Sequence, residues 1–184
     1  MGMDLQEEKE LLKRIYLLSM LNEGIDKKEY DKLGSEERLR VELRGDKYFL
    51  RDYERKKIKV GLTGGVFDVL HLGHVFTLQK AKERCDLLVV VIASDALALK
   101  TKRKLLHTQT YRQRMMQAIK YVDYVLLGGE DRMNALEMIS PDLVIFGYDQ
   151  KPFLHEGKYK IMQIRESMND DIYKSSRIIK ELGY

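Results

Sequence analysis

The sequence has few of the residues that fix a chain through covalent bonds or rigid rings. Its 184 residues include one cysteine, two prolines and no tryptophan. The lone cysteine, Cys85, excludes a disulfide framework within the chain and is typical of a reducing compartment. Because Cys85 directly precedes the apolar run 87–93, we expect it to be a small buried hydrophobe rather than a reactive thiol.

Long apolar stretches are also missing. The longest, 87–93, is far too short to span a bilayer, and the first residues carry charges from Asp4 onward without the apolar core of a signal peptide. We therefore expect a cytoplasmic protein with no membrane partner. The net charge of +4 arises from 33 basic and 29 acidic residues, a mixture that suits anionic nucleotides and predicts no nucleic-acid partner.

Residues 1–54 read differently from the rest of the chain. Apolar residues at helical spacing predict two helices, which end near Gly24 and Gly34. Alternating residues over 39–43 and 48–53, with a turn between them, predict a β-hairpin. Two helices and a hairpin are typical of a winged-helix-like module, or of an appendage that packs on another domain or forms a dimer interface. The lack of a third predicted helix favours the appendage.

From residue 57 onward, predicted strands and helices alternate. The strands are expected over 58–62, 87–93, 122–127, 143–146 and 160–164, and the helices over 74–83, 110–120, 131–139 and 175–181. Strands separated by helices of this length predict a parallel sheet with right-handed crossovers, covered on both faces. Residues 57–184 should therefore form an α/β domain, a Rossmann-like doubly wound parallel sheet of about five strands.

One motif follows the first of these strands. Residues 64–74 read Gly-Gly-Val-Phe-Asp-Val-Leu-His-Leu-Gly-His and lead into the predicted helix. The N-terminus of a helix presents unpaired N–H groups to an anion, and Gly64 and Gly65 let the backbone approach it closely. His71 and His74 could donate hydrogen bonds to charge that develops on a phosphate. Neither GxxxxGK[ST] nor GxGxxG after a strand is present to suggest another phosphate site.

This segment resembles the (T/G)GxFDxxHxGH loop of the cytidylyltransferase-like nucleotidyltransferases. Such enzymes transfer a nucleoside monophosphate from ATP or CTP to a phosphate-bearing acceptor and release pyrophosphate. The resemblance implies in-line attack by the acceptor phosphate, with His71 and His74 bonded to the α- and β-phosphate oxygens. The nucleotide-binding residues that it implies are Gly64, Gly65, Val66, Phe67, His71, Leu72, Gly73 and His74.

Further site residues follow from the same resemblance. Lys104 is expected to act in catalysis and, with Arg112, to bind the acceptor phosphate. Asp68 is expected to orient the histidine loop on the acceptor side. The family's Glu-x-x-Arg pattern is matched only at Arg112, since Gln109 and Thr110 stand near the glutamate position.

Two more nucleotide-binding elements lie towards the C-terminus. Gly147 and Asp149 match a Gly-x-Asp near the ribose and base, and Ser175 and Ser176 match serines that hold the β- and γ-phosphates. Lys174 replaces a serine at the position before them. No protein metal site is expected, and Mg²⁺ or another divalent cation would be carried by the triphosphate.

The acceptor and the nucleotide stay open between alternatives. Residues 145–150 and 173–179 look most like the archaeal FAD synthases, which transfer AMP from ATP to FMN. The stretch from Leu106 to Asp123 is equally similar to the glycerol-3-phosphate cytidylyltransferases, which use CTP. A remote alternative is a nucleotide-sensing DNA-binding regulator that reads DNA with residues 1–54. Members of the family are often dimers, so the resemblance also allows a homodimer.

Overall fold

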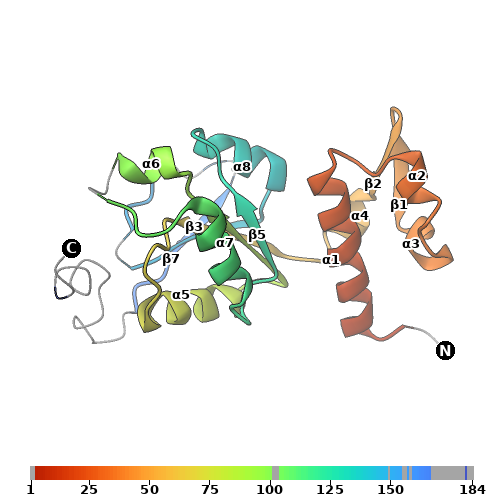
Figure 1. Ribbon diagram of the computed structural model, residues 1–184. Coiled ribbons are helices and arrows are strands. Elements are labelled where there is room, and N and C mark those ends of the chain that lie inside the picture. Colours follow the sequence, from red (N-terminus) through yellow and green to blue (C-terminus); the bar gives the residue numbers. More distant parts are fainter. Residues whose placement is uncertain are drawn as a thin grey trace. The chain divides into compact units, whose positions relative to one another are not determined.

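The computed structural model describes residues 3–100, 104–148, 150–154, 157, 159–166 and 181. The chain divides into two compact units, Met1–Lys59 and Val60–Tyr184 (Figure 1). The division falls at Lys59 rather than at the predicted 55–56, because a short helix after the hairpin contacts the first helix of the first unit.

The described part of the first unit contains four helices and one antiparallel hairpin. Its elements are α1 (Leu5–Leu21), α2 (Lys27–Tyr30), α3 (Ser35–Leu39), β1 (Val41–Arg44), β2 (Lys47–Leu50) and α4 (Asp52–Arg55). The predicted hairpin is confirmed, with Arg44 opposite Lys47 and a positive φ of 63° at Gly45 in the turn. The prediction missed α3 and α4, which are too short to show helical periodicity. α3 ends at the first residue of the expected strand 39–43, and α4 begins within the expected strand 48–53.

Arg40 joins separate elements of the first unit through ion pairs. Its Nη1 lies 2.9 Å from Oε1 of Glu8 on α1 and 2.7 Å from Oε1 of Glu54 on α4. Lys57 contacts the same two carboxylates at 2.8 and 2.9 Å. Glu54 has a side chain only 2% exposed, so its charge depends on these partners. The pKa of Arg40 is raised, first by its hydrogen bond to Glu54, and the pKa of Glu8 is lowered, first by its hydrogen bond from Lys57.

No helix in the described ranges is long and apolar enough to cross a membrane. The longest described helix, α1, has 17 residues and carries several charged side chains.

The second unit is built on a five-stranded parallel sheet in the order β5-β4-β3-β6-β7. Its described elements are β3 (Val60–Gly65), α5 (Leu72–Lys82), β4 (Leu87–Ile92), α6 (Asp95–Leu99), α7 (Gln109–Gln117), β5 (Tyr124–Leu127), α8 (Arg132–Ile139), β6 (Leu143–Phe146) and β7 (Lys160–Gln163). The α/β class, the parallel sheet and the five strands predicted from the sequence are confirmed.

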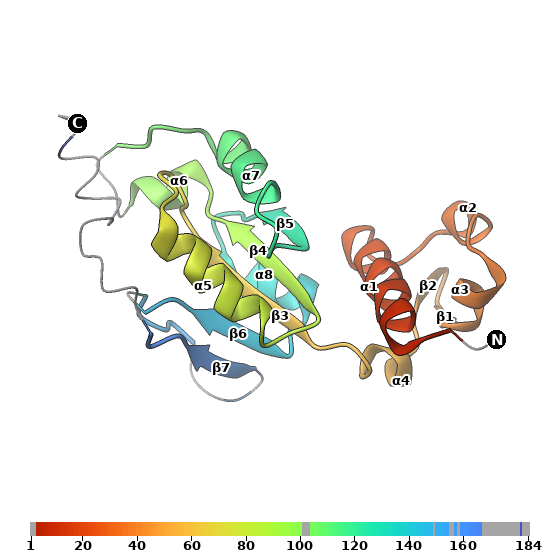
Figure 2. The same ribbon diagram turned by 90° about the horizontal axis from the view of Figure 1, so that it is seen from below.

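Helices cover both faces of this sheet. α5 and α8 lie on opposite sides of it in both views (Figures 1 and 2). On the side of α5, Leu78 packs in one cluster with Leu88 and Val90 of β4. The alternate residues Val91 and Val144 line the side of α8 instead. Because successive strand residues point to opposite faces, the continuous apolar runs in the sequence supply both cores.

Several element bounds in the second unit differ from the predicted ones by one to three residues, and one helix was not predicted. β3 starts two residues later than the predicted 58–62 and continues through Gly65, because both glycines extend the register against β4, with Gly65 opposite Ile92. α6 was not predicted, since five residues are too few to show a helical period. The helix predicted over 175–181 lies largely outside the described residues.

Cys85 is half-buried against Gly61 of β3. A Cβ on Gly61 would lie 2.7 Å from Sγ of Cys85, so the thiol fills the space that the glycine leaves. Burial raises the pKa of this thiol to about 11. The group therefore stays protonated near neutral pH and behaves as the packing residue that the sequence predicts.

Replacing Arg40 by glutamine should destabilise the first unit. Buried Glu54 would lose its shortest ion pair, and one lost charged partner costs about 1–3 kcal/mol. The loss should be measured by urea unfolding combined with amide exchange over Leu5–Leu21. Only the part of this loss that comes from the Arg40–Glu8 pair should shrink as the pH falls through the lowered pKa of Glu8, because a protonated Glu8 carboxyl no longer needs the guanidinium.

Arg44 provides the matched control for this variant. It also pairs with two carboxylates, but its side chain is 44% exposed and theirs are 37% and 81% exposed. Arg44→Gln should change stability by less than about 1 kcal/mol, as expected for surface pairs. Equal losses in the two variants would show that burial of Glu54 does not matter.

Candidate active site

The two histidines of the motif come together where β3 passes into α5. His71 is the N-cap of α5 and His74 lies in its first turn, and their ring centroids are 3.9 Å apart. The first turn of a helix presents backbone N–H groups and the positive end of its dipole. Two adjacent imidazoles at that position can donate to the oxygens of one anion, and a phosphate group matches both the charge and the spacing.

Neighbouring residues hold these two rings in place. A Cβ on Gly73 would lie 3.0 Å from Nδ1 of His71, so a larger residue at this position would crowd that ring. The Phe67 ring contacts His74 edge-on at 5.3 Å. Phe67 has a φ of 52°, unusual for a bulky residue, and backbone strain of this kind gathers at functional sites.

The Phe67 side chain supports His74 from the core. It is 9% exposed and belongs to the core cluster on the side of α5, and its predicted contact with a nucleotide stays a prediction. The backbone of the loop between β3 and α5 is still available to bind the nucleotide. The structure brings Gly64, Gly65, Val66, Leu72 and Gly73 to the same sheet edge as the two histidines, as the sequence predicts.

Asp68 binds a second loop. Its carboxylate accepts hydrogen bonds from the backbone N–H groups of Leu106 and His107, at 3.0 and 2.9 Å. Nδ1 of His107 lies 2.9 Å from the carbonyl oxygen of Asp68. Asp68 is 1% exposed and its carboxylate is bonded within the protein, so its place on the acceptor side stays a prediction. Asp68 therefore holds the loop that carries Lys104. Lys104 is exposed and lies two residues before Leu106.

Arg112 is likewise internal. Its side chain is 0% exposed, and its guanidinium donates to the carbonyl oxygens of Val66, Ala93 and His107. It also pairs with the Asp95 carboxylate at 2.7 Å. These bonds tie Arg112 to three loops of the same sheet edge, and its predicted contact with the acceptor phosphate stays a prediction. Arg112 is a positioning residue.

Two glutamines that were not predicted to belong to the site also bind backbone groups at this edge of the sheet. The Gln109 amide donates to the carbonyl oxygens of Ile92 and Gly128, at 2.9 and 2.8 Å. A glutamate carboxylate has no N–H group to donate to these two carbonyl oxygens. This explains why a glutamine suits this position, which lies near the glutamate position of the family pattern. Gln150 accepts from the N–H of Gly147 and donates to the carbonyl oxygen of Gly64, both at 2.8 Å.

Gln150 could have been found from the sequence. It directly follows the Gly-x-Asp segment at the end of β6, where polar residues meet at the carboxyl edge of a parallel sheet. Through Gln150, Gly147 is tied to the glycine turn that precedes the histidines. Asp149, Ser175 and Ser176 lie outside the described residues, so their predicted contacts stay predictions.

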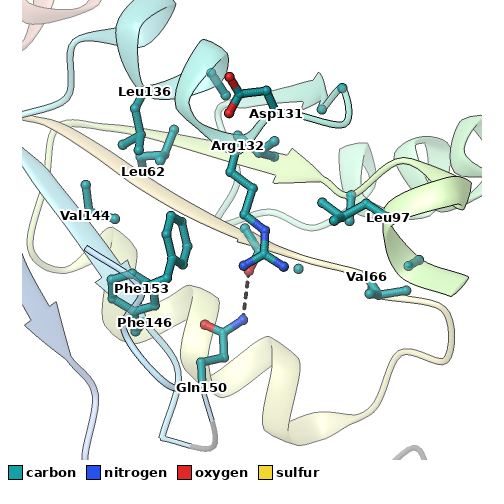
Figure 3. A pocket seen from close by; sticks show the side chains of 18 of the residues that line it. Leu62, Val66, Leu97, Asp131, Arg132, Leu136, Val144, Phe146, Gln150 and Phe153 are labelled. Carbon is teal, nitrogen blue, oxygen red and sulfur yellow. Dashed lines mark hydrogen bonds between the residues drawn. The ribbon is translucent and has the colours of Figure 1, made fainter. Parts of the chain in front are cut away.

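An apolar cavity opens at this edge on the side of the sheet that α8 covers. It has a volume of about 320 Å³, and its walls come from the ends of β3, β4 and β6 and from α6 and α8 (Figure 3). Gly64, Gly65 and Val66 line it and then continue into the loop that ends at His71. The histidines and the cavity are thus joined by one short segment.

Metal coordination by side chains alone finds little support in the described ranges. They hold no cluster of three or more His, Cys, Asp or Glu side chains that could bind a metal ion.

Comparison with known proteins identifies the second unit. A family model described as cytidylyltransferase-like matches residues 62–181. The chain belongs to the cytidylyltransferase-like family. It is therefore a nucleotidyltransferase, as the histidine motif predicts, and the first unit lies before the matched residues.

Curated relatives share most of their length with the chain. A FAD synthase of Thermococcus kodakarensis is 38% identical over 133 residues, which are 67% of this chain and 87% of that protein. A FAD synthase of Thermococcus sibiricus is 33% identical over 141 residues, or 70% of this chain and 95% of that protein. A FAD synthase of Thermoplasma acidophilum is 37% identical over 61% of this chain and 79% of its own.

One solved structure agrees with the fold. The crystal structure of a lipopolysaccharide core biosynthesis protein from Thermoplasma volcanium is 32% identical, with a TM-score of 0.55. The match covers 61% of this chain and 99% of that one, as expected if only the second unit is shared.

Replacing Arg112 by lysine should damage the edge even though the charge is kept. One ammonium group cannot reach three carbonyl oxygens and a carboxylate that the planar guanidinium joins. We expect a loss of about 2–4 kcal/mol in unfolding free energy, from several acceptors left unsatisfied. Arg114→Lys, on an exposed position of the same helix, is the control and should change stability by less than about 0.5 kcal/mol. Normal stability of Arg112→Lys would contradict the positioning role.

Proposed function

We propose that this chain transfers AMP from ATP to FMN and releases pyrophosphate, forming FAD. The observation that carries the transfer chemistry is the pair of adjacent imidazoles at the first turn of α5, whose ring centroids are 3.9 Å apart. The choice of ATP and FMN is supported by the relatives named FAD synthase, which the chain matches over most of their length.

The reaction needs no nucleophile from the protein. A phosphate oxygen of FMN attacks the α-phosphorus of ATP in line, and the bond from that phosphorus to the bridging oxygen breaks as pyrophosphate leaves. His71 and His74 donate hydrogen bonds to the phosphate oxygens as negative charge develops on them. Positioning and charge stabilisation then supply the catalysis, as in other phosphoryl transfers.

The other groups proposed to bind the phosphates lie on neighbouring parts of the chain or enter with the nucleotide. Lys104 lies on the loop that Asp68 holds beside the histidine loop, from which its ammonium group can approach a phosphate. Ser175 and Ser176 are proposed for the β- and γ-phosphates on the family pattern alone. Mg²⁺ enters as part of the nucleotide substrate, since this ion binds triphosphates and water more readily than closed protein cages.

The similarity to glycerol-3-phosphate cytidylyltransferases rests on residues with structural roles. His107 is bonded to the Asp68 backbone, and Arg112 is buried among carbonyl oxygens. These residues hold loops that any family member with this sheet edge needs, so they do not select glycerol phosphate as the acceptor. The structure offers no separate observation in favour of the CTP-dependent alternative.

A pyrophosphate-release assay tests the substrates directly. ATP and CTP should each be combined with FMN, glycerol 3-phosphate, phosphocholine and phosphopantetheine. We expect turnover only with ATP and FMN, and a higher melting temperature with MgATP than with MgCTP, because ligands stabilise the state that binds them. Turnover of CTP with an alcohol phosphate would overturn the proposed substrates while leaving the transfer chemistry in place.

Variants of the two histidines test the chemistry. His71→Ala and His74→Ala should each lower kcat by about 10²–10³, the usual cost of removing one preorganised donor. Neither should unfold the protein, since both rings lie at the surface edge and are only half-buried. Asparagine at either position keeps one donor and should recover part of the rate. If an alanine variant retains near-normal kcat, that histidine does not contact the transferred phosphate.

A further inference from the structure

We propose that the cavity on the side of α8 holds the planar ring system of the acceptor, with Phe153 against the ring and Arg132 at its polar edge. This inference rests on the proposed function and names two specificity-determining residues for it. Neither residue is part of the histidine motif or of the loops that surround it.

The size of the cavity suits a ring system rather than a whole dinucleotide. Its volume of about 320 Å³ lies at the lower end of the roughly 300–1,000 Å³ typical of small-molecule pockets. The chain leaves the cavity through Gly64, Gly65 and Val66, which lie five to seven residues before His71. A ring in the cavity and a phosphate at the histidines would therefore belong to the two ends of one ligand.

The cavity has an apolar interior and a polar mouth. Leu62, Leu136, Val144 and Phe146 supply the interior, whereas the polar side chains come from the start of α8 and the segment after β6. The flavin ring has the same division, with a dimethylbenzene end and a pyrimidine-dione end. Adenine has polar edges without alkyl groups, and glycerol phosphate has no ring, so neither would match the apolar interior.

Arg132 and Phe153 form the mouth. The guanidinium carbon of Arg132 lies 5.0 Å from the centroid of the Phe153 ring, and Phe153 meets Phe146 edge-on at 5.6 Å. Figure 3 shows the Arg132 side chain reaching from the start of α8 into the cavity towards Gln150. Phe153 is 46% exposed, so a planar ligand could cover an aromatic face that solvent now reaches.

Among the residues that the structure describes, Arg132 forms no ion pair with a carboxylate. Its guanidinium contacts the Phe153 ring, and the neighbouring Asp131 accepts from the N–H of Met133 at the start of α8. A guanidinium carries several donors in a fixed plane, which matches the carbonyl oxygens along one edge of a pyrimidine-dione. This edge, rather than the phosphate, is the group assigned to Arg132.

The segment that carries Phe153 is held in place independently of a ligand. The Gln150 side chain is bonded at both ends, to Gly147 and Gly64, and its backbone carbonyl accepts from Gln163 at 3.0 Å. These bonds fix the start of the segment three residues before Phe153. The ring site is therefore largely preformed, as is usual for small-molecule pockets.

Flavin binding to the full chain tests the proposal. Riboflavin carries the ring without the phosphate, so its fluorescence quenching on titration with protein reports ring binding alone, and FMN reports both groups. Arg132→Gln and Phe153→Leu should each weaken both flavins by a similar factor, about tenfold. In the assay with ATP, the KM for FMN should rise by the same factor, with little change in kcat or in the KM for ATP.

The first unit supplies matched controls. There the guanidinium carbon of Arg44 lies 5.8 Å from the Phe49 ring centroid, an arginine–phenylalanine pair that does not line the cavity. Arg44→Gln and Phe49→Leu should leave both flavin affinities and the KM for FMN unchanged.

Each of the other possible results of these experiments contradicts a specific part of the proposal. Weaker FMN binding with normal riboflavin binding would assign Arg132 to the phosphate, and a raised KM for ATP would assign the cavity to the nucleotide base. Unchanged flavin binding in both variants would remove the ring site while FAD formation by the unmodified chain upholds the proposed function. If the unmodified chain neither binds flavins nor forms FAD, the proposed function is wrong and the ring site with it.

Discussion

The buried guanidinium of Arg112 is the constraint on which the active edge depends. It joins the loops after β3 and β4 and the loop before α7, through carbonyl oxygens that have no strand partner at that edge. Burying a charge is costly unless its donors are satisfied, so the loops and the arginine require each other. The histidine loop can hold a strained Phe67 because the surrounding segments are fixed in this way.

The sheet separates two tasks on its two sides. On one side, α5 begins with the paired histidines, and the core behind them positions their rings through Phe67. On the other side, α8 and the end of β6 enclose an apolar cavity. Both meet at the last residues of β3, where glycines allow close approach of the backbone. This geometry gives a transferase one place for phosphate chemistry and another for recognition of the group that receives the nucleotide.

The two units are held together internally by different means. The second has a large apolar cluster between sheet and helices. The first combines a smaller core, including Leu12 and Ile15, with ion pairs around Arg40 and Glu54. The family model matches residues 62–181, which lie within the second unit. The regulator alternative, the packing role and a homodimer all stay predictions for the first unit.

Much of this protein was determined by local sequence. Continuous apolar strands alternating with helices gave the α/β class and the five-stranded parallel sheet, because such strands must be covered on both faces. The glycines and histidines of residues 64–74 indicated the chemistry, since they are close in sequence and need only one strand–helix turn to meet. The short helices α3 and α6 escaped prediction because they span too few residues to show a period.

Tertiary structure decided the roles of the charged and amide side chains. Arg112 and Asp68 look like ligand-binding residues in the sequence, yet each is buried and bonded to backbone groups that lie 19 to 46 positions away. Arg112 also donates to the nearby His107 carbonyl and to the Asp95 carboxylate. The cavity with Arg132 and Phe153 likewise exists only once β3, β6 and α8 are brought together. A sequence pattern specifies which groups can donate or accept, but burial and long-range partners decide whether those groups serve the fold or the ligand.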